Sequence, residues 1–247
     1  MPAPPGWMVL LVAPVIGSFL GVVVRRLAAG RPLVLARSRC DSCGHALGAR
    51  DLVPLASFAF QRGRCRHCGA RIGVFYPAIE LAALAVALAA FLPARSGGAL
   101  WANAALGWAL LAAAWIDAER YWLPDMITLP LLLAGLAVTW ARMPAAIYDH
   151  AMAAALGYAA FRLLDMVYWR LRGRHGLGRG DAKLLAAAGA WVGLAALPVL
   201  VLTAGLLALA VALPLALRRG QGGQTMLPFG PALALAFFGS ALLAAPG

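Results

Sequence analysis

The sequence predicts an all-α polytopic membrane protein with about eight transmembrane helices and one small hydrophilic domain between the first two. Three observations lead to this fold class. The 247 residues are 63% hydrophobic and only 12% charged, with a mean hydropathy of +0.83, well above that of a water-soluble domain. The apolar residues fall into runs long enough to cross a bilayer core of about 30 Å. The polar residues instead concentrate between residues 25 and 76.

Eight apolar runs have the length of a membrane span. The first ends at Arg25-Arg26 without a small-residue cleavage site, so we expect a retained helix rather than a signal peptide. Leu197-Pro198 divides the last long apolar region, and one helix through both parts would be too long for a single crossing. We therefore prefer eight spans to the alternative of seven. The expected spans are 7–24, 77–93, 99–116, 126–141, 146–168, 182–195, 197–217 and 228–246.

The basic residues indicate how these spans are oriented. The chain carries a formal net charge of +12, and the stretch from Arg25 to Tyr76 alone contains ten arginines. If that stretch is cytoplasmic, eight crossings place the loops after the third, fifth and seventh spans on the same side. Nearly all of the remaining basic residues lie in or beside those loops. Only Arg95 and Arg142 fall on the other side. This is the asymmetry of the positive-inside rule. We therefore interpret the charge mainly as a topology signal and expect the lipid bilayer, not nucleic acid, as the partner.

The hydrophilic stretch holds all four cysteines, as Cys40-x-x-Cys43 and Cys65-x-x-Cys68. A glycine follows each pair, which allows the backbone to turn sharply and point amides at thiolate sulfurs. Two such knuckles supply the four ligands of a tetrahedral zinc site. The alternative, a redox pair or two disulfides, needs an oxidising compartment, whereas the charge pattern places this stretch in the reducing cytosol. We therefore predict a structural Zn²⁺ that stabilises a domain too small for a core of its own.

Several carboxylates lie within or beside the spans, and most have a structural explanation. Asp149 fits an exposed helix start, and Asp165 follows Arg162 by three residues, the spacing of an ion pair on one helix. Asp125 follows a proline in the first turn of a span, where a carboxylate complements the helix dipole. Glu80 either caps the second span or faces a polar cavity, and the sequence leaves both roles open.

Asp117 and Asp181 lack such an explanation. Asp117 ends a span, where the helix dipole is negative and disfavours another anion. Asp181 follows the run Gly176-Leu-Gly178-Arg-Gly180, whose missing side chains let another segment approach the backbone closely. A phosphate-binding loop is the alternative for these glycines, but no strand precedes them and the Gly-Lys-Ser/Thr ending is absent. Because carboxylates close to lipid are costly, we expect both to be functional.

Two carboxylates from separate helices fit acid–base hydrolysis. Held a few ångströms apart, they share one proton, so that one activates water while the other polarises the scissile carbonyl. The chain has no His-Glu-x-x-His zinc helix and no serine nucleophile motif. The residues by themselves therefore indicate an intramembrane aspartyl hydrolase. A proton-coupled transporter that uses the same carboxylates as a relay is the alternative, and a zinc-module anchoring protein is a third class.

At these residues the chain resembles the type IV prepilin leader peptidases of bacterial pilus and type II secretion systems. The resemblance covers nearly the whole chain. One departure is Gly21, where the family's first-span motif leads us to expect asparagine. Gly-x-Gly-Asp alone is shared with presenilin-like proteases, but the motifs together and in this order are specific. They are the first-span stretch from Gly17 to Arg26, the two Cys-x-x-Cys pairs, Tyr76-Pro-Ala-Ile-Glu80-Leu, Asp117 with Leu123-Pro-Asp125-Met-Ile-Thr-Leu-Pro, Gly178-Arg-Gly180-Asp181-Ala-Lys183-Leu-Leu, and Pro228-Phe-Gly-Pro231.

The resemblance implies that the chain cleaves the short basic leader from prepilins and pseudopilins by an aspartyl mechanism, with Asp117 and Asp181 as the catalytic pair. It also implies N-methylation of the newly exposed residue, with S-adenosyl-L-methionine as donor. Members with the zinc loop are those associated with both steps. The sequence itself reveals no S-adenosylmethionine pocket, so the residues that bind this cofactor stay unknown.

The expected organisation follows from the spans and the resemblance. Residues 1–24 form the first helix, 25–76 the four-cysteine zinc-binding domain, and 77–247 a membrane-embedded aspartyl peptidase domain of about seven helices. The expected location is the bacterial inner membrane, with the zinc domain and active site on the cytoplasmic side.

A cytoplasmic face this basic should repel a basic leader. We expect the arginines mainly to contact anionic lipid head groups, while Glu80, Glu119 or Asp125 meets the leader. The candidate supporting or substrate-contacting residues are therefore Asp125, Gly178, Gly180, Lys183 and Glu80.

Overall fold

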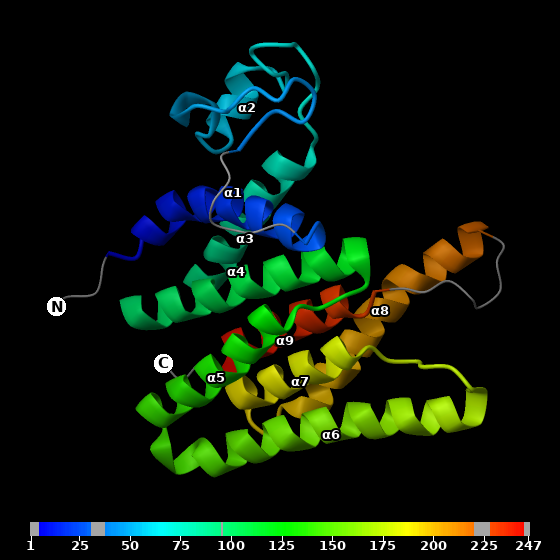
Figure 1. The fold of residues 1–247 in the computed structure, drawn as a ribbon. Coiled ribbons are helices and arrows are strands. Elements are labelled where there is room, and N and C mark those ends of the chain that lie inside the picture. The colour runs from blue at the N-terminus through cyan, green and yellow to red at the C-terminus, as the bar shows by residue number, and fades with distance from the viewer. Residues whose placement is uncertain (1–4, 31–37, 95, 220–227, 245–247) are drawn as a thin grey trace. The chain divides into compact units, whose positions relative to one another are not determined.

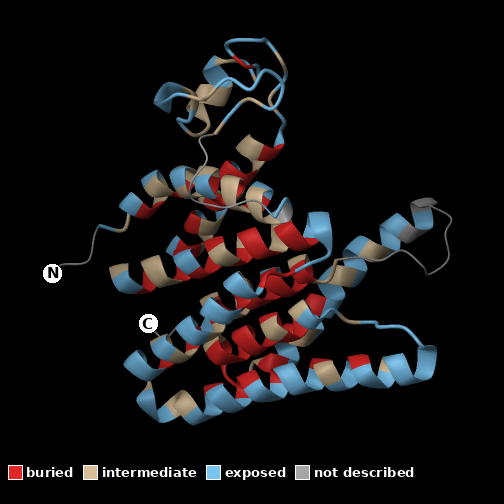
Figure 2. Cartoon of the chain, viewed as in Figure 1, coloured by how far each residue is buried: buried red, intermediate tan, exposed pale blue. Residues whose placement is uncertain are grey.

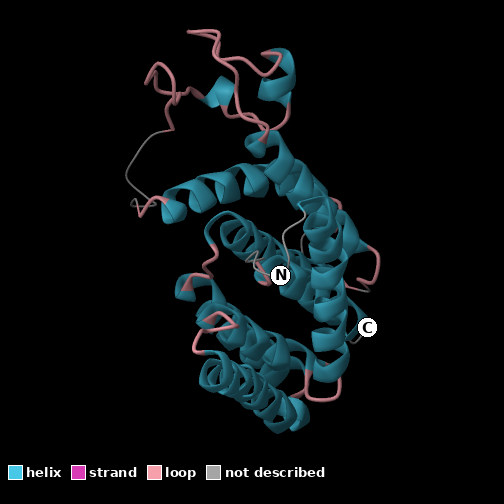
Figure 3. Cartoon of the chain, turned by 90° about the vertical axis from the view of Figure 1, so that its right-hand side faces the viewer, coloured by secondary structure: helices cyan, strands magenta, loops and turns pink. Residues whose placement is uncertain are grey.

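The structure, a computed structural model, describes residues 5–30, 38–94, 96–219 and 228–244. In these residues the chain forms helices and loops, with two isolated β-bridges and no strand (Figures 1 and 3). Eight long helices and one short helix make up this part of the chain. They are α1 (Met8–Ala28), α2 (Ala56–Phe60), α3 (Phe75–Phe91), α4 (Gly97–Arg120), α5 (Asp125–Arg142), α6 (Ile147–Arg172), α7 (Arg179–Val192), α8 (Leu197–Arg219) and α9 (Gly230–Ala244).

The eight long helices lie at the eight predicted spans, which confirms the all-α membrane class. Within the described part of the chain, five helices are long and apolar enough to cross a membrane: α1, α4, α5, α6 and α8. The helices α3 and α9 are apolar but shorter, and α7 has only 14 residues. Arg95, which the charge pattern places on the non-cytoplasmic side, lies outside the described residues.

The last long apolar region contains two separate helices, as the eight-span interpretation requires. The break, however, falls earlier than predicted. Helix α7 ends at Val192, and Gly193 follows with a φ of +77°, a conformation that a side chain disfavours. Pro198 lies inside α8, in its first turn, where a missing N–H leaves no hydrogen bond unmade. The glycine, rather than the proline, therefore separates the two helices.

The chain divides into two compact units, one up to Ala112 and one from Ala113 onward, so the boundary falls within α4. In the first unit α1 packs along α3 (Figure 1). The two backbones approach closely at Gly17, where an added Cβ would lie 2.6 Å from the Cα of Glu80. Close approach at small residues is the usual packing of membrane helices, because apolar surface gives no preference for protein over lipid.

In the second unit α7 is the most buried helix and packs against α5, α6 and α9. Ten of its 14 residues are buried. Figure 2 colours buried residues red. Its alanines and glycines permit this, since a Cβ on Gly189 would lie 2.5 Å from the backbone of Ala153 in α6. By contrast, α8 exposes large apolar side chains such as Leu202 and Leu206. A helix that is apolar on its exposed face fits a lipid surrounding. The first turn of α7, which carries Asp181, is thereby held by several neighbours.

Candidate functional site

The four cysteines come together as the sequence predicts. Their Sγ atoms all lie within 4.8 Å of one another, and those of Cys40 and Cys68 are 3.9 Å apart. Sulfurs around a tetrahedral zinc ion lie roughly 3.8 Å apart, because each Zn–S bond is about 2.3 Å long, whereas a disulfide bond is about 2.05 Å. All four cysteines are free thiols. The cluster is therefore a candidate metal centre and does not contain the disulfides of the alternative interpretation.

Each Cys-x-x-Cys pair forms a tight knuckle of the same form. Gly44 donates its backbone N–H to the carbonyl of Cys40, and Gly69 donates to that of Cys65, both at 2.9 Å. The φ angles of the two glycines are +69° and +71°, in the left-handed region that favours glycine. The glycine after each pair therefore closes the knuckle, as the sequence predicts.

The electrostatics of the cluster favour a bound cation. Hydrogen bonds from the backbone amides of Cys43 and Ser42 lower the pKa of the Cys40 thiol to about 7. The backbone amide of Ala70 also favours the Cys68 thiolate, but desolvation and hydrogen bonds with the neighbouring thiols raise the pKa of Cys68 to about 11. Four sulfurs this close cannot all ionise unless a positive charge neutralises them. A metal ion among the four sulfurs would supply that charge.

Glu80, in α3, forms a hydrogen bond with the cysteine segment, residues 38–74. Its buried carboxylate accepts the backbone N–H of Leu55 through Oε2 at 2.7 Å, at the start of α2. It also lines a cavity of about 490 Å³ within the first unit. The sequence left two roles open for Glu80, a cap on its own helix or a position facing a polar cavity. In the structure Glu80 lines the cavity. The backbone amide that it binds belongs to the start of α2 and not to its own helix. Other residues around the cavity include Ser18, Arg25, Asp51, Phe58 and Tyr76.

Asp117 lies in the last turn of α4, and its side chain is buried. Its Oδ2 accepts the backbone N–H of Gly230, the first residue of α9, at 2.9 Å. The carboxylate therefore complements the positive end of the α9 dipole, although it stands at the negative end of its own helix. Sequence reasoning missed this partner, which is 113 residues away.

Asp181 lies in the first turn of α7 and is also buried. Its Oδ2 accepts the backbone N–H of Gly178, the N-cap residue, at 3.2 Å. This is the half of a capping box that an acid at the third helical position supplies. Its Oδ1 is buried and has no hydrogen-bond partner among the residues that the structure describes. A buried carboxylate oxygen without a partner is rare in proteins, and it is a place for a proton or a water molecule. The glycines before it allow close approach as predicted, because a Cβ on Gly180 would lie 2.6 Å from the Cβ of Leu123.

Asp117 and Asp181 are linked through α9, whose first residue donates to Asp117 and which packs against α7. A second contact in the same region joins Lys183 to Asp125, whose Nζ and Oδ1 atoms are 2.6 Å apart. Together with the Gly230 contact, these interactions bring the end of α4 and the starts of α5, α7 and α9 to one end of the second unit. The predicted residues Asp117, Asp125, Asp181 and Lys183 are therefore gathered in one region, whereas Glu80 belongs to the first unit.

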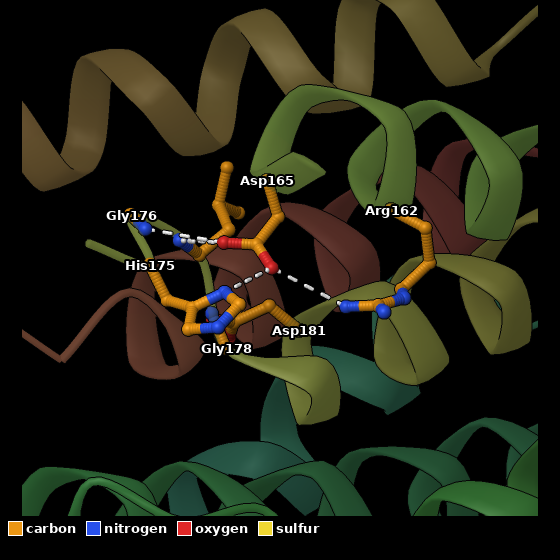
Figure 4. A network of polar contacts seen from close by, with 7 residues as sticks. Arg162, Asp165, His175, Gly176, Gly178 and Asp181 are labelled. Carbon is orange, nitrogen blue, oxygen red and sulfur yellow. Dashed lines mark hydrogen bonds and ion pairs between the residues drawn. The ribbon is translucent and has the colours of Figure 1, made fainter. Parts of the chain in front are cut away.

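Asp165 has a larger network than the predicted ion pair with Arg162. That pair is present at 3.3 Å, but the same carboxylate also accepts hydrogen bonds from the loop that follows α6 (Figure 4). A buried acid shortly before a glycine-rich loop is the sequence signal that could have indicated this. Asp149 starts α6 as an exposed residue, as predicted, and accepts the N–H of Leu194.

The fold and these side chains define a polytopic membrane protein with two buried acids at helix ends and a separate four-cysteine centre. Residues 11–94 match the bacterial peptidase A24 N-terminal domain, and residues 104–213 match the type IV leader peptidase family. The chain belongs to the type IV leader peptidase family and is an enzyme of that family. This confirms the resemblance found in the sequence.

Several relatives are similar over most of their length, and all three described here are named prepilin leader peptidase/N-methyltransferase. The protein from Burkholderia pseudomallei (strain 1026b) is 43% identical, over 89% of this chain and 79% of the relative. The Aeromonas hydrophila protein is 35% identical over 93% and 87%, and the Pseudomonas aeruginosa protein 36% over 92% and 86%. No solved structure matches this chain at a significant level.

Proposed function

We propose that this enzyme cleaves the basic leader from type IV prepilins and pseudopilins, with Asp117 and Asp181 as its catalytic acids. The observation that carries the proposal is the state of the two carboxylates. Both are buried, they come from separate helices, and each is held by one backbone amide through Oδ2. Within the described part of the chain the Oδ1 of Asp181 has no hydrogen-bond partner, so it is available to a water molecule. The names of the relatives supply the substrate class.

The proposed reaction needs no covalent intermediate. The ionised acid removes a proton from water, and the resulting hydroxide attacks the scissile carbonyl carbon while the protonated acid donates to the carbonyl oxygen. The C–N bond then breaks, and a proton passes to the leaving amine. The products are the leader, with a new carboxylate, and the mature pilin, with a free N-terminal amine. The amides of Gly178 and Gly230 each occupy one oxygen of an acid, and the second oxygen of each acid then serves the reacting atoms.

The proposed location is the cytoplasmic border of the bacterial inner membrane. A prepilin has a basic leader followed by an apolar membrane helix, so its scissile bond lies near the head groups. The distribution of basic residues supports a cytoplasmic position for the loops beside Asp117 and Asp181. The two acids and the scissile bond would then lie at the same depth.

Replacement of either acid tests the peptidase proposal. We expect Asp117→Asn and Asp181→Asn to abolish cleavage of a purified prepilin, because neither variant can share a proton between two carboxylates. Asp149→Asn is the matched control. Asp149 also accepts a backbone amide, but it lies in the first turn of α6, whereas the loop that leads to Asp181 follows the last turn of that helix. Product masses from the purified proteins measure the effect. Cleavage by either acid variant at the wild-type rate would contradict the mechanism, and carboxylate-dependent proton flux without cleavage would favour a transporter.

We also propose that the cysteine cluster holds a structural Zn²⁺ and that the chain methylates the new N-terminus with S-adenosylmethionine. The names of the relatives support the second activity. The cavity beside Glu80 has the size of a small-molecule site. The side chains that line it fit this cofactor, because Arg25 suits a carboxylate, Asp51 and Glu80 suit a sulfonium and an ammonium, and the ring of Phe58 suits an adenine. When bound, the cofactor supplies the methyl group.

Direct binding tests the cavity independently of activity. We expect Phe58→Ala to weaken the binding of labelled S-adenosylmethionine by about tenfold, on the scale of about 1–3 kcal/mol for a lost stacking contact. Phe60→Ala is the matched control, because Phe60 lies on the same short helix but is 88% exposed and outside the cavity. Equilibrium dialysis gives the dissociation constants. Equal affinities of the two variants would place the cofactor elsewhere.

A further inference from the structure

The carboxylate of Asp165 is devoted mainly to the loop that connects α6 to α7. Its Oδ1 accepts the backbone N–H groups of Gly176 at 3.1 Å and Leu177 at 3.2 Å. Its Oδ2 meets the Nδ1 of His175 at 2.9 Å and the Nη1 of Arg162 at 3.3 Å. Asp165 itself is only 3% exposed. Three of its four partners therefore belong to the loop, and only Arg162 belongs to its own helix.

The same loop is packed tightly against α6. A Cβ on Gly176 would lie 2.7 Å from the ring of Tyr168, so the backbone touches that ring directly. Figure 4 shows the Asp165 carboxylate between the loop residues His175 and Gly176 on one side and Arg162 on the other. A buried carboxylate is stable only when such donors satisfy it, so the loop and Asp165 depend on each other.

These contacts continue to Asp181. Leu177, which donates to Asp165, is followed directly by Gly178, whose own N–H is bonded to Asp181 Oδ2. The position of that N–H is therefore set by the backbone that Asp165 holds. A small displacement of the loop moves the donor, and the Asp181 carboxylate turns with it.

We propose that Asp165 is a positioning residue for Asp181. By accepting the amides of Gly176 and Leu177, it fixes the loop whose next amide orients the Asp181 carboxylate. It acts on the turnover of bound prepilin rather than on prepilin binding. This proposal rests on the proposed peptidase function.

Three variants in the full-length enzyme test the proposal. Asp165→Ala removes the carboxylate oxygen that accepts both backbone amides. We expect kcat for prepilin cleavage to fall by about 10- to 100-fold, because small misplacements of a reacting group have effects of that size. KM should stay within about threefold, since prepilin binding is unchanged. Asp165→Asn keeps an oxygen that accepts both amides while losing the charge, so it should recover most of kcat. Asp149→Ala removes a matched bond, from the same helix to Leu194 at the far end of α7, and should leave kcat unchanged.

Hydrogen exchange gives a readout that does not depend on activity. The amides of Gly176 and Leu177 should exchange faster in Asp165→Ala and at the wild-type rate in Asp165→Asn, whereas Asp149→Ala should affect Leu194 instead. Equal losses of kcat in Asp165→Ala and Asp165→Asn would overturn the proposal, because the ion pair with Arg162 would then explain the residue. Wild-type kcat in Asp165→Ala would overturn it as well.

The proposed function can fail separately. If Asp181→Asn retains full cleavage, the peptidase mechanism fails, whatever the exchange data show. If Asp181→Asn is inactive and Asp165→Ala behaves like Asp149→Ala, only the positioning role fails. Should Asp165→Ala not fold, Gly176→Ala displaces the same loop from the Tyr168 side. That variant must then show the same loss of kcat with unchanged KM, and wild-type kcat there would overturn the proposal.

Discussion

A single glycine controls the space beside Asp117. A Cβ on Gly230 would lie 2.5 Å from Asp117 Oδ2, well inside van der Waals contact. We expect Gly230→Ala to turn the carboxylate away and to lower kcat for prepilin cleavage on the order of 100-fold. Steady-state kinetics of the purified variant measure this loss.

The matched control is Gly239→Ala, on the same helix. A Cβ at that position would meet nothing within 4 Å, so its kcat should equal that of the wild type. Thermal unfolding of both variants checks that α9 is intact. Full activity of Gly230→Ala would mean that Asp117 does not need the observed orientation.

The distance from an added Cβ to its neighbours also distinguishes two glycines of α1. At Gly17 a Cβ would lie 2.6 Å from the Cα of Glu80, so α1 and α3 require the glycine. At Gly21 the nearest atom, on Ile79, would be 3.4 Å away, an ordinary contact. Packing therefore does not require glycine at position 21, where the family motif leads us to expect asparagine.

Between elements, the ion pair of Lys183 and Asp125 links α7, just after its first turn, to the first turn of α5. The two side chains are 29% and 57% exposed, so solvent screens their attraction. We expect a double-mutant cycle with Lys183→Met and Asp125→Asn to give a coupling energy of no more than about 1 kcal/mol. Unfolding of the four proteins in detergent measures it.

Activity gives a second measure of the same pair. Because about 1.4 kcal/mol corresponds to a tenfold change in rate, Lys183→Met should lower kcat by less than about tenfold if Lys183 acts only through Asp125. A much larger loss, with the small coupling energy retained, would assign Lys183 a direct role toward prepilin or Asp181.

At the scale of the molecule, we expect the cysteine segment to depend on a bound metal ion. Between Ser38 and Val74, a stretch that the structure describes completely, Cys65 is the only buried residue. A segment without an apolar core is held by other bonds, and structural zinc contributes about 10–16 kcal/mol in small zinc domains. We therefore expect one zinc ion per chain, and chelation should make this segment sensitive to protease while the membrane helices persist.

Elemental analysis, limited proteolysis and circular dichroism measure these three properties. Cys65→Ser should lose the metal and show the same protease sensitivity, whereas Ser96→Ala, outside the segment, should show neither. A metal-free wild-type protein with a protease-resistant segment would contradict the zinc proposal.

The sequence by itself determined the class of fold, the positions of the eight long helices and the cysteine cluster. These features depend on local properties: the length of an apolar run, the spacing of two cysteines, and a glycine that permits a tight turn. It also located Asp117 and Asp181 at helix ends, because a carboxylate at the edge of an apolar run can be recognised without knowing how the helices pack.

Only the tertiary structure decided what these acids touch. Gly230 reaches Asp117 across 113 residues, and Leu55 reaches Glu80 from a different segment. The sequence predicted an ion pair between Asp165 and Arg162. The structure contains that pair, but the other three of the four partners of Asp165 come from the loop before Asp181. Backbone amides are present at nearly every position, so a sequence cannot tell which of them will meet a given carboxylate. Helix packing makes that choice, because it alone brings distant segments within hydrogen-bond distance.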